Sequence, residues 1–391
     1  MTPDARISAA IDILEACLGG DSAERVLTSW ARGNRYAGSK DRAAIRDLVF
    51  DALRCRRSFG WLGGAGDGLP TGRQLMIGAL RAAGTDPATV FGTGRFAPEA
   101  LAEGEMPDTD LAEAPEAVRL DCPDWLMPLF AQSLGAAAPA ALARQQARAP
   151  VFLRVNKRKA TVSFALEVLQ KDGIEARPHP LSETALEVTE GARAVARSQA
   201  YLSGLVELQD AGSQALVDLL PLDAGLEVLD YCAGGGGKSL AMAARADVAM
   251  TAHDIDAARM QDITPRASRA GVSIQCASSA ELKPAYDLVL CDAPCSGSGS
   301  WARAPQAKWL LTPARLAELQ SLQAEILDTA ADLVAAGGTL AYATCSVFES
   351  ENHAQVVAFL ARRPAFSLRQ ERLISPLDGG DGFYVAVLQR Q

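Results

Sequence analysis

Two cysteines in separate segments rich in glycine and serine are the residues best suited to chemistry. Cys295 lies in Asp292-Ala293-Pro294-Cys295-Ser296-Gly297, and Cys345 lies in Thr344-Cys345-Ser346. Each segment follows a short apolar run with the composition of a β-strand. Ligands of an open α/β sheet bind beyond the carboxyl ends of its strands, so we expect both thiols and Asp292 in one crevice. Two thiols and a carboxylate there indicate covalent chemistry on an electron-poor carbon.

Each of these residues also has a purely structural interpretation. A buried and inert side chain is the usual state of a single cysteine. Asp292 could simply cap a turn, which Pro294 would stiffen by restricting the residue before it. Two cysteines at the ends of neighbouring strands, each next to a serine, favour the chemical interpretation.

A glycine-rich segment follows an earlier apolar run and marks a second candidate site. Its glycines let the backbone approach a ligand closely, and the helix that follows offers free N–H groups. Asp254 ends the next predicted strand, where a carboxylate can bind a ribose diol. The predicted cofactor-binding residues are Cys232, Ala233, Gly234, Gly235, Gly236, Gly237, Lys238, Asp254 and Asp292.

Three ligands remain compatible with this segment taken alone. A phosphate loop nearly fits Gly237-Lys238-Ser239, but Cys232 stands where its first glycine is required. A dinucleotide fingerprint is loosely satisfied, and so is a pocket for S-adenosylmethionine. A structural turn is the fourth interpretation.

The elements that must position these residues alternate between strand and helix from about Leu222 onward. The clearest helical pattern covers 313–336. This alternation predicts a doubly wound, largely parallel sheet. The predicted strands are Glu227–Tyr231, Val248–His253, Val272–Cys276, Tyr286–Cys291, Thr339–Ala343 and Gly382–Gln389.

The composition divides the rest of the chain into three further parts. Residues 1–83 have helical periodicity, 84–122 form an acidic stretch predicted to be a linker, and 123–220 combine helices with a strand near 151–159. The last domain then covers 221–391. The arginines of the second N-terminal helix form either a solvated surface or a phosphate-binding face.

The most basic stretch of the chain begins after Asp124 and contains no acid before Glu167. A basic stretch of this kind favours contact with nucleic acid. The predicted RNA contacts, one of which lies outside this stretch, are Arg154, Asn156, Lys157 and Lys308.

The overall composition limits the class of protein. The chain has 391 residues, 49% of them hydrophobic, and a net charge of −9, which argues against a protein that coats nucleic acid non-specifically. No membrane span or secretion signal is evident, so we expect a cytoplasmic monomer with free thiols. We predict no metal site, because the three histidines are scattered and no Cys-x-x-Cys pair occurs.

The motifs together resemble the RNA 5-methylcytosine methyltransferases of the Sun/NOL1/NOP2 group. The glycine segment, the Asp292–Gly297 segment and Thr344-Cys345-Ser346 carry the resemblance in this order. Residues 1–80 resemble the NusB-like RNA-binding domain of bacterial members that act on 16S ribosomal RNA. Further matching segments are Gln209-Asp210-Ala211-Gly212-Ser213-Gln214, Lys308-Trp309, Glu351-Asn352 and Asp381-Gly382-Phe383-Tyr384.

The resemblance implies a fold, a cofactor and a role for each candidate. It implies a doubly wound Rossmann-like methyltransferase domain, preceded by an all-α NusB-like domain and a small α+β RNA-binding subdomain. S-adenosylmethionine would be the cofactor and RNA, most of all ribosomal RNA, the partner. Cys345 would attack C6 of cytosine, Asp292 would bind N3, and Cys295 would act in release of the product. The chain departs from the family pattern at Gly235, at Cys276-Ala277-Ser278-Ser279 and at Gln306.

Two other functions remain open at this point. One is a DNA cytosine methyltransferase with Cys295 as its nucleophile, which would leave the Thr344–Ser346 segment unexplained. The other is a catalytically weak or inactive RNA-binding ribosome assembly factor, against which both cysteines and Asp292 argue.

Overall fold

The computed structural model describes residues 1–66, 68–106 and 108–391, which divide into two compact units. The helical unit comprises residues 1–148 and 301–310, and the sheet unit comprises 149–300 and 311–391. These units are not the four predicted domains, whose boundaries stay a prediction.

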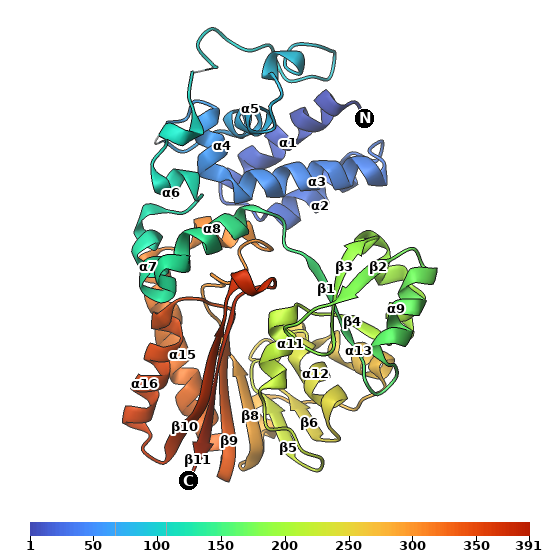
Figure 1. Cartoon of the computed structure of the whole chain (residues 1–391), viewed down its shortest axis with the longest axis vertical. Coiled ribbons are helices and arrows are strands. Elements are labelled where there is room, and N and C mark those ends of the chain that lie inside the picture. Colours follow the sequence, from blue (N-terminus) through green and yellow to red (C-terminus); the bar gives the residue numbers. More distant parts are fainter. Residues whose placement is uncertain (67, 107) are drawn as a thin grey trace. The chain divides into compact units, whose positions relative to one another are not determined.

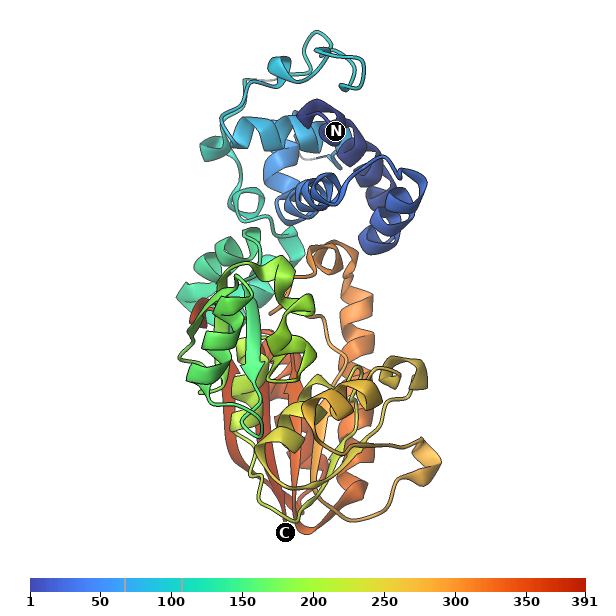
Figure 2. The ribbon, with the colours of Figure 1, turned by 90° about the vertical axis from the view of Figure 1, so that its right-hand side faces the viewer.

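The N-terminal helices of the helical unit pack around one apolar core. The blue ribbons of Figures 1 and 2 show the course of these helices. Buried Ile13 and Leu14, Ile45 and Val49, and Leu75 come from three different helices of this core. The helices of the unit are α1 (Pro3–Leu18), α2 (Ala23–Gly33), α3 (Ser39–Arg54), α4 (Arg56–Leu62), α5 (Gly72–Ala82), α6 (Glu116–Arg119), α7 (Met127–Leu134), α8 (Ala138–Gln146) and α14 (Pro305–Leu310).

The predicted acidic linker contributes to this unit. Phe91 is buried in the core, and Arg73 of α5 forms an ion pair with Glu105. Short 3₁₀ turns occur within this part of the chain, for example at Leu111–Glu113. Several of its side chains therefore pack against the helices.

One segment of the helical unit comes from the distant sequence 301–310. Trp301 is buried with its ring centroid 5.9 Å from that of Phe130, and the indole N–H of Trp309 donates to the carbonyl oxygen of Leu53 at 2.6 Å. Gln306 accepts a hydrogen bond from the N–H of Ala23 at 2.9 Å. The Gln306 amide, one of the departures from the family pattern, thus binds the first residue of α2.

Asp124–Gln146 is long and apolar enough, by composition alone, to cross a membrane. In the structure the segment is interrupted at Gly135, which has a φ of 54°. Phe130 and Leu142 are buried within the unit. The segment thus forms two short helices, α7 and α8, with apolar side chains packed inside the unit. That the chain has no membrane span stays a prediction.

The sheet unit begins with a small α+β part. Its four antiparallel strands lie in the order β2-β3-β1-β4, and apolar residues such as Leu153, Leu169 and Val206 form its core. The elements are β1 (Val151–Val155), α9 (Val162–Lys171), β2 (Glu175–Pro178), β3 (Ala185–Glu190), α10 (Gln199–Leu202) and β4 (Val206–Leu208).

A seven-stranded sheet in the order β10-β11-β9-β8-β5-β6-β7 forms the rest of this unit. Strands β9, β8, β5, β6 and β7 are parallel, and β11 and β10 are antiparallel to their neighbours. The elements are α11 (Ala211–Asp218), β5 (Glu227–Asp230), α12 (Gly237–Arg245), β6 (Ala249–Ala252), α13 (Ile263–Ala270), β7 (Gln275–Cys276), β8 (Tyr286–Asp292), α15 (Pro313–Leu333), β9 (Val334–Thr344), α16 (His353–Arg362), β10 (Phe366–Ile374) and β11 (Phe383–Arg390).

Both faces of this sheet are covered by helices, as Figure 1 shows. Successive side chains of a strand point to opposite faces, so Leu288 and Leu290 pack toward α11 and α12 while Val289 and Cys291 pack toward α15 and α16. Burial on both faces explains the nearly continuous apolar runs of the parallel strands.

The predicted Rossmann-like fold is confirmed, with one strand added. β10 was not predicted, because most of its side chains are exposed and it pairs only with β11. An edge strand with exposed side chains lacks the apolar run that predicts the other strands of this sheet. The predicted helix at 313–336 ends earlier, at Leu333.

The contact between α4 and α5 provides a test of packing in the helical unit. A Cβ atom at Gly78 would overlap the carbonyl oxygen of Phe59. We expect Gly78→Ala to lower the free energy of unfolding by about 1–3 kcal/mol, because overpacking forces backbone to move. Urea unfolding measures this. Gly33→Ala is the control, since no atom lies within 4 Å of its added Cβ, and equal effects of the two changes would contradict the prediction.

Candidate functional site

A cavity of about 450 Å³ lies in the sheet unit at the carboxyl ends of β5, β6, β8 and β9. Five of the predicted site residues line it, and these are Cys232, Asp254, Asp292, Cys295 and Cys345. The sheet therefore brings residues from four strand ends to one cavity, as the pattern of motifs predicted.

The glycine segment forms a tight turn between β5 and α12. Gly234 and Gly236 have φ angles of 51° and 77°, which favour glycine. A Cβ atom on Gly236 would lie 2.7 Å from Ile263. The N–H of Gly234 donates to Asp254 at 2.9 Å, and Arg259 donates to the same oxygen at 3.0 Å. Asp254 thus fixes the loop as well as lining the cavity.

Lys238, at the start of α12, carries a buried charge in the site. Its Nζ donates to Oδ2 of Asp292 at 2.6 Å. Burial opposes the charge, but the attraction of Asp292 and the hydrogen bond to it raise the pKa of Lys238 above its ordinary value. Lys238 was predicted only as a cofactor contact, and the structure places it on Asp292.

Asp230 is buried beside this ion pair at the end of β5. Its Oδ2 accepts a hydrogen bond from the hydroxyl of Ser239 at 2.6 Å, while Oδ1 has no partner among the described residues. Burial raises the pKa of Asp230 to about 7. The carboxyl group therefore holds a proton for a large share of the time near neutral pH, which limits repulsion with Asp292.

The two thiols lie next to each other, with 3.5 Å between Sγ of Cys295 and Sγ of Cys345. A hydrogen bond from Cys295 lowers the pKa of Cys345, against the effect of burial, and the positive charge of Lys238 adds to the lowering. The same pairing, with burial, raises the pKa of Cys295. Of the two, Cys345 is the residue that ionises first, with Cys295 as its hydrogen-bond donor.

A buried carboxylate joins the two cysteine segments. Glu351 accepts hydrogen bonds from the backbone N–H of Ser296 at 2.8 Å and from the hydroxyls of Ser296 and Ser346 at 2.5 Å each. Gln323 of α15 donates to Glu351 at 3.0 Å and to the carbonyl oxygen of Pro294 at 2.9 Å. Each serine follows one of the cysteines, so Glu351 sets the separation of the thiols.

Three of the four predicted RNA contacts are enclosed by protein. Arg154 binds Gln209 and the carbonyl oxygen of Gly237. Asn156 donates to the carbonyl oxygens of Gly204 and Ala270, and Lys308 is only 2% exposed, within the helical unit. Burial lowers the pKa of Lys308 and the nearby Asp121 opposes this. All three side chains are mostly buried, but Arg154 lines a pocket together with Lys157, so contact with RNA stays a prediction.

Lys157 alone of these four candidates has a largely exposed side chain, at 55%, and it forms an ion pair with Glu183. The basic character of the stretch did not distinguish Lys157 from its neighbours. Phe152–Val155 are all buried, so both faces of β1 are covered and Arg154 lies in the interior although it is charged.

The sequence reasoning missed the roles of Glu351 and of α15 in the site. Glu351 belongs to the Glu351-Asn352 segment of the resemblance, but its partners are distant in sequence, so the sequence predicts no role for it. Leu322, Glu325, Ile326 and Thr329 of α15 line the cavity. The exposed Ile255, next to Asp254, also lines it, and an exposed apolar residue after a strand end was the signal that could have found it.

Two family models match this chain. The model described as 16S rRNA methyltransferase RsmB/F matches residues 217–389, and that of the RsmF/B-like ferredoxin-like domain matches residues 122–195. Ribosomal RNA small subunit methyltransferase B of Erwinia tasmaniensis is 33% identical over 285 residues. The match covers 69% of this chain and 66% of the relative, so it spans just under two thirds of the relative's length.

Solved structures share the fold. The crystal structure of PH0851 has a TM-score of 0.76 at 21% identity, and the match covers 100% of this chain and 99% of that one. NSun6 from Pyrococcus horikoshii, crystallised with SFG, has a TM-score of 0.60 at 15% identity and covers 68% of this chain and 98% of its own. Identities this low support the fold alone.

The sheet, the glycine turn and the paired thiols define a protein of the Rossmann-like methyltransferase class. The two family models together cover most of the chain beyond residue 121, and they agree with the motifs in their order. The chain belongs to the RsmB/F methyltransferase family, which confirms the resemblance to RNA 5-methylcytosine methyltransferases.

Removal of the buried carboxylate tests its role in the structure. We expect Glu351→Ala to lower the free energy of unfolding of the sheet unit by about 3 kcal/mol, because several buried donors lose their acceptor. Glu351→Gln keeps one acceptor oxygen and should cost less. Urea unfolding provides the measurement, and Glu318→Ala, which removes a 63% exposed carboxylate, should change little. An effect of Glu351→Ala as small as that of the control would refute the role.

The hydrogen bond between the thiols predicts a pH effect. Without the Cys295 donor the Cys345 thiolate is less stable, so the pKa of Cys345 should rise in Cys295→Ala. The rate of alkylation of Cys345 by iodoacetamide, followed by peptide mass spectrometry, should then reach half its maximum at a higher pH. Exposed Cys276 is the internal control, and an unchanged Cys345 profile would mean that Cys295 does not stabilise the thiolate.

Proposed function

We propose that this protein transfers a methyl group to C5 of a cytosine in RNA, and that the RNA is 16S ribosomal RNA. The observation that carries the proposal is the pair of thiols, 3.5 Å apart, in the cavity that also contains Asp292. A thiolate with a lowered pKa can add to a carbon, and a neighbouring thiol can stabilise it again when it departs. The descriptions of the family model and of the Erwinia relative support rRNA as the substrate.

The residues around the cavity fit S-adenosylmethionine. Asp254 and exposed Ile255 offer a carboxylate and an apolar surface for its nucleoside part. The left-handed glycines of the turn bring Cys232 to the cavity lining beside them. The cofactor supplies an electrophilic methyl group when bound. We therefore propose Cys232–Lys238, Asp254 and Asp292 as the segment and carboxylates that surround it.

The first step is attack by the Cys345 thiolate on C6 of the cytosine ring. A bond forms between Sγ and C6, and the electron pair of the C5–C6 double bond moves toward C5, N3 and the carbonyl group. Asp292 binds the N3 edge and delivers a proton there, and Lys238, 2.6 Å from its Oδ2, is positioned to supply that proton. C5 then has the electron density needed to accept a methyl group.

Release reverses the first bond. Water takes the C5 proton, the electron pair of that C–H bond forms the C5–C6 double bond, and the bond between Sγ of Cys345 and C6 breaks. N3 then returns its proton to Asp292. The hydrogen bond from Cys295 then stabilises the departing thiolate, as it does in the resting site. A single contact between the thiols thus assists both the attack and the release. Both steps require the target base to leave its stack and enter the cavity.

The test is the product formed by the unaltered protein and three variants with S-adenosylmethionine and unmodified 16S ribosomal RNA. Cys345→Ala should form no 5-methylcytosine, because it lacks the nucleophile. Cys295→Ala should form a covalent protein–RNA adduct that accumulates, because release is slowed. Nucleoside mass spectrometry measures the product and denaturing gel electrophoresis the adduct, and Cys276→Ala, which changes an exposed cysteine outside the cavity lining, should match the unaltered protein.

Other outcomes identify the alternative functions. Product from Cys345→Ala would make Cys295 the nucleophile, and a preference for DNA over RNA would then make the protein a DNA cytosine methyltransferase. The unaltered protein forming no product on any RNA would leave the ribosome assembly factor as the interpretation. In that case titration with S-adenosylmethionine would show whether the cofactor still binds.

A further inference from the structure

Four consecutive glycines, Gly234 to Gly237, lead from the end of β5 into α12. Glycine loses more conformational freedom on ordering than any other residue, so a run of four is difficult to hold in one conformation. The N–H of Gly236 donates to the carbonyl oxygen of Ala233 at 2.8 Å, which closes the turn without involving the polar groups of Gly235. The restraint on Gly235 comes from another element.

Arg266 of α13 provides that restraint. Its guanidinium group donates a hydrogen bond to the carbonyl oxygen of Gly235. The side chain of Arg266 is largely buried, at 21% exposed, and a Cβ atom on Gly235 would lie 3.3 Å from its Nη1 atom. Arg266 is not among the described residues that line the cavity, so it acts on a ligand there through the turn and not by touching the ligand.

A carboxylate of the small α+β part directs Arg266. Glu207 of β4 forms ion pairs with Arg266, at 3.5 Å, and with Arg269, one helical turn further along α13, at 2.7 Å. Glu207 is itself fixed, because it is buried and accepts a hydrogen bond from the N–H of Leu208 at 3.1 Å. Arg269 also lies over the ring of Tyr201, 4.3 Å from its centroid. The small sheet thus supplies the acid that orients the arginine on the turn.

A second carbonyl oxygen of the glycine run is held by the same part of the fold. Arg154 of β1 donates to the carbonyl oxygen of Gly237 at 3.0 Å. In the register of the small sheet Arg154 lies opposite Glu207. Two arginines next to one buried carboxylate therefore hold two carbonyl oxygens of the run.

We propose that Arg266, directed by Glu207, is a positioning residue that holds the glycine turn in the conformation that binds S-adenosylmethionine. The apparent Kd of a ligand rises as the fraction of protein in the binding conformation falls, so a turn without its restraint binds more weakly. Cofactor affinity then depends on the α+β part, although none of the described residues that line the cavity belongs to that part. The inference rests on the proposed function in taking the glycine turn as part of the cofactor site.

Isothermal titration calorimetry of the full-length protein with S-adenosylmethionine measures the effect. We expect Arg266→Ala to raise the Kd about tenfold, which corresponds to a turn in the binding conformation for about a tenth of the time. Glu207→Gln should raise it less, and adding Glu207→Gln to Arg266→Ala should cause no further loss, because the two residues act as a unit. During turnover the KM for the cofactor should rise while kcat at saturating cofactor stays unchanged.

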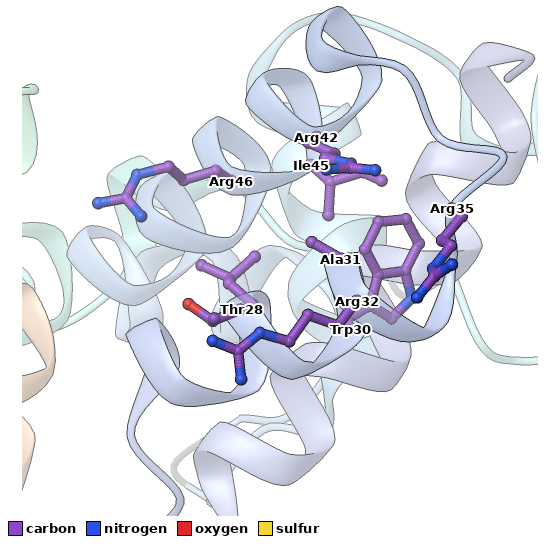
Figure 3. Close-up of a pocket in the computed structure, with 9 residues that line it drawn as sticks. Thr28, Trp30, Ala31, Arg32, Arg35, Arg42, Ile45 and Arg46 are labelled. Atoms are coloured by element: carbon purple, nitrogen blue, oxygen red, sulfur yellow. The ribbon is translucent and has the colours of Figure 1, made fainter.

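Two variants control for the loss of a positive charge. Arg269→Ala removes the same charge from the same helix and leaves the hydrogen bond from Arg266 to Gly235 in place. Arg32→Ala removes it from the helical unit, where Figure 3 shows Arg32 beside a pocket between α2 and α3. Both variants should bind the cofactor within about twofold of the unaltered protein.

Hydrogen exchange tests the restraint in the absence of cofactor. The amides of Gly234 and Gly236 are hydrogen-bonded in the turn. We expect them to exchange about tenfold faster in Arg266→Ala, with the amides of β11 unchanged as evidence that the sheet is intact. Adding Gly235→Ala to Arg266→Ala should recover part of the affinity, because it narrows the conformations of the turn and its Cβ no longer meets Nη1 of Arg266.

Three results would overturn the proposal. An unchanged Kd in Arg266→Ala would do so, with or without faster exchange, and so would an equal loss of affinity in Arg269→Ala, since charge and not the contact would then be responsible. Absence of cofactor binding by the unaltered protein would overturn both this proposal and the proposed function. Failure of the proposed function alone is a separate observation: a protein that forms no 5-methylcytosine but whose cofactor binding depends on Arg266 supports the restraint and contradicts the methyl transfer.

Discussion

The reactive arrangement of this protein depends on one buried carboxylate. Glu351 receives hydrogen bonds from Ser296 and Ser346, the residues that follow the two cysteines, and from Gln323 of α15. A buried charge is tolerated only when its hydrogen bonds are complete, so these groups must all be in place together. The separation of the thiols is thus a consequence of satisfying a carboxylate, and the geometry for chemistry forms in the same step as the local fold.

Charge in the cavity is balanced around a single cation. Lys238 lies between Asp292, to which it donates, and Cys345, whose pKa it helps to lower. Burial raises the pKa of Asp230 to about 7, so this carboxyl group is protonated part of the time. Lys238 then has two full negative charges near it, those of Asp292 and the Cys345 thiolate, and not three. Without that cation, a carboxylate and a thiolate could not share so small a volume. Lys238, at the start of α12, therefore connects the glycine turn with Asp292 and Cys345.

Local patterns in the sequence predicted the parallel strands and the cavity residues. Continuous apolar runs located β5, β6, β8 and β9, and the motifs after them located Cys232, Asp254, Asp292, Cys295 and Cys345. The pattern failed where tertiary contacts decide. Edge strand β10 has too few buried side chains to be recognised, Glu351 acts through partners distant in sequence, and Lys308 looks like a surface cation until the fold buries it. Composition gives the sign of a charge and not its exposure.

The short segment 301–310 limits how far the two units can be treated as modules. The polypeptide passes between them three times, at residues 148–149, 300–301 and 310–311. A fragment that began at Ala149 would retain Trp301 and Trp309 but lose Phe130 and Leu53, their partners in the helical unit. Gene fusions or truncations at that boundary would leave two indoles in water. The packing of the helical unit is therefore completed only by a segment that lies far from the rest of it in the sequence.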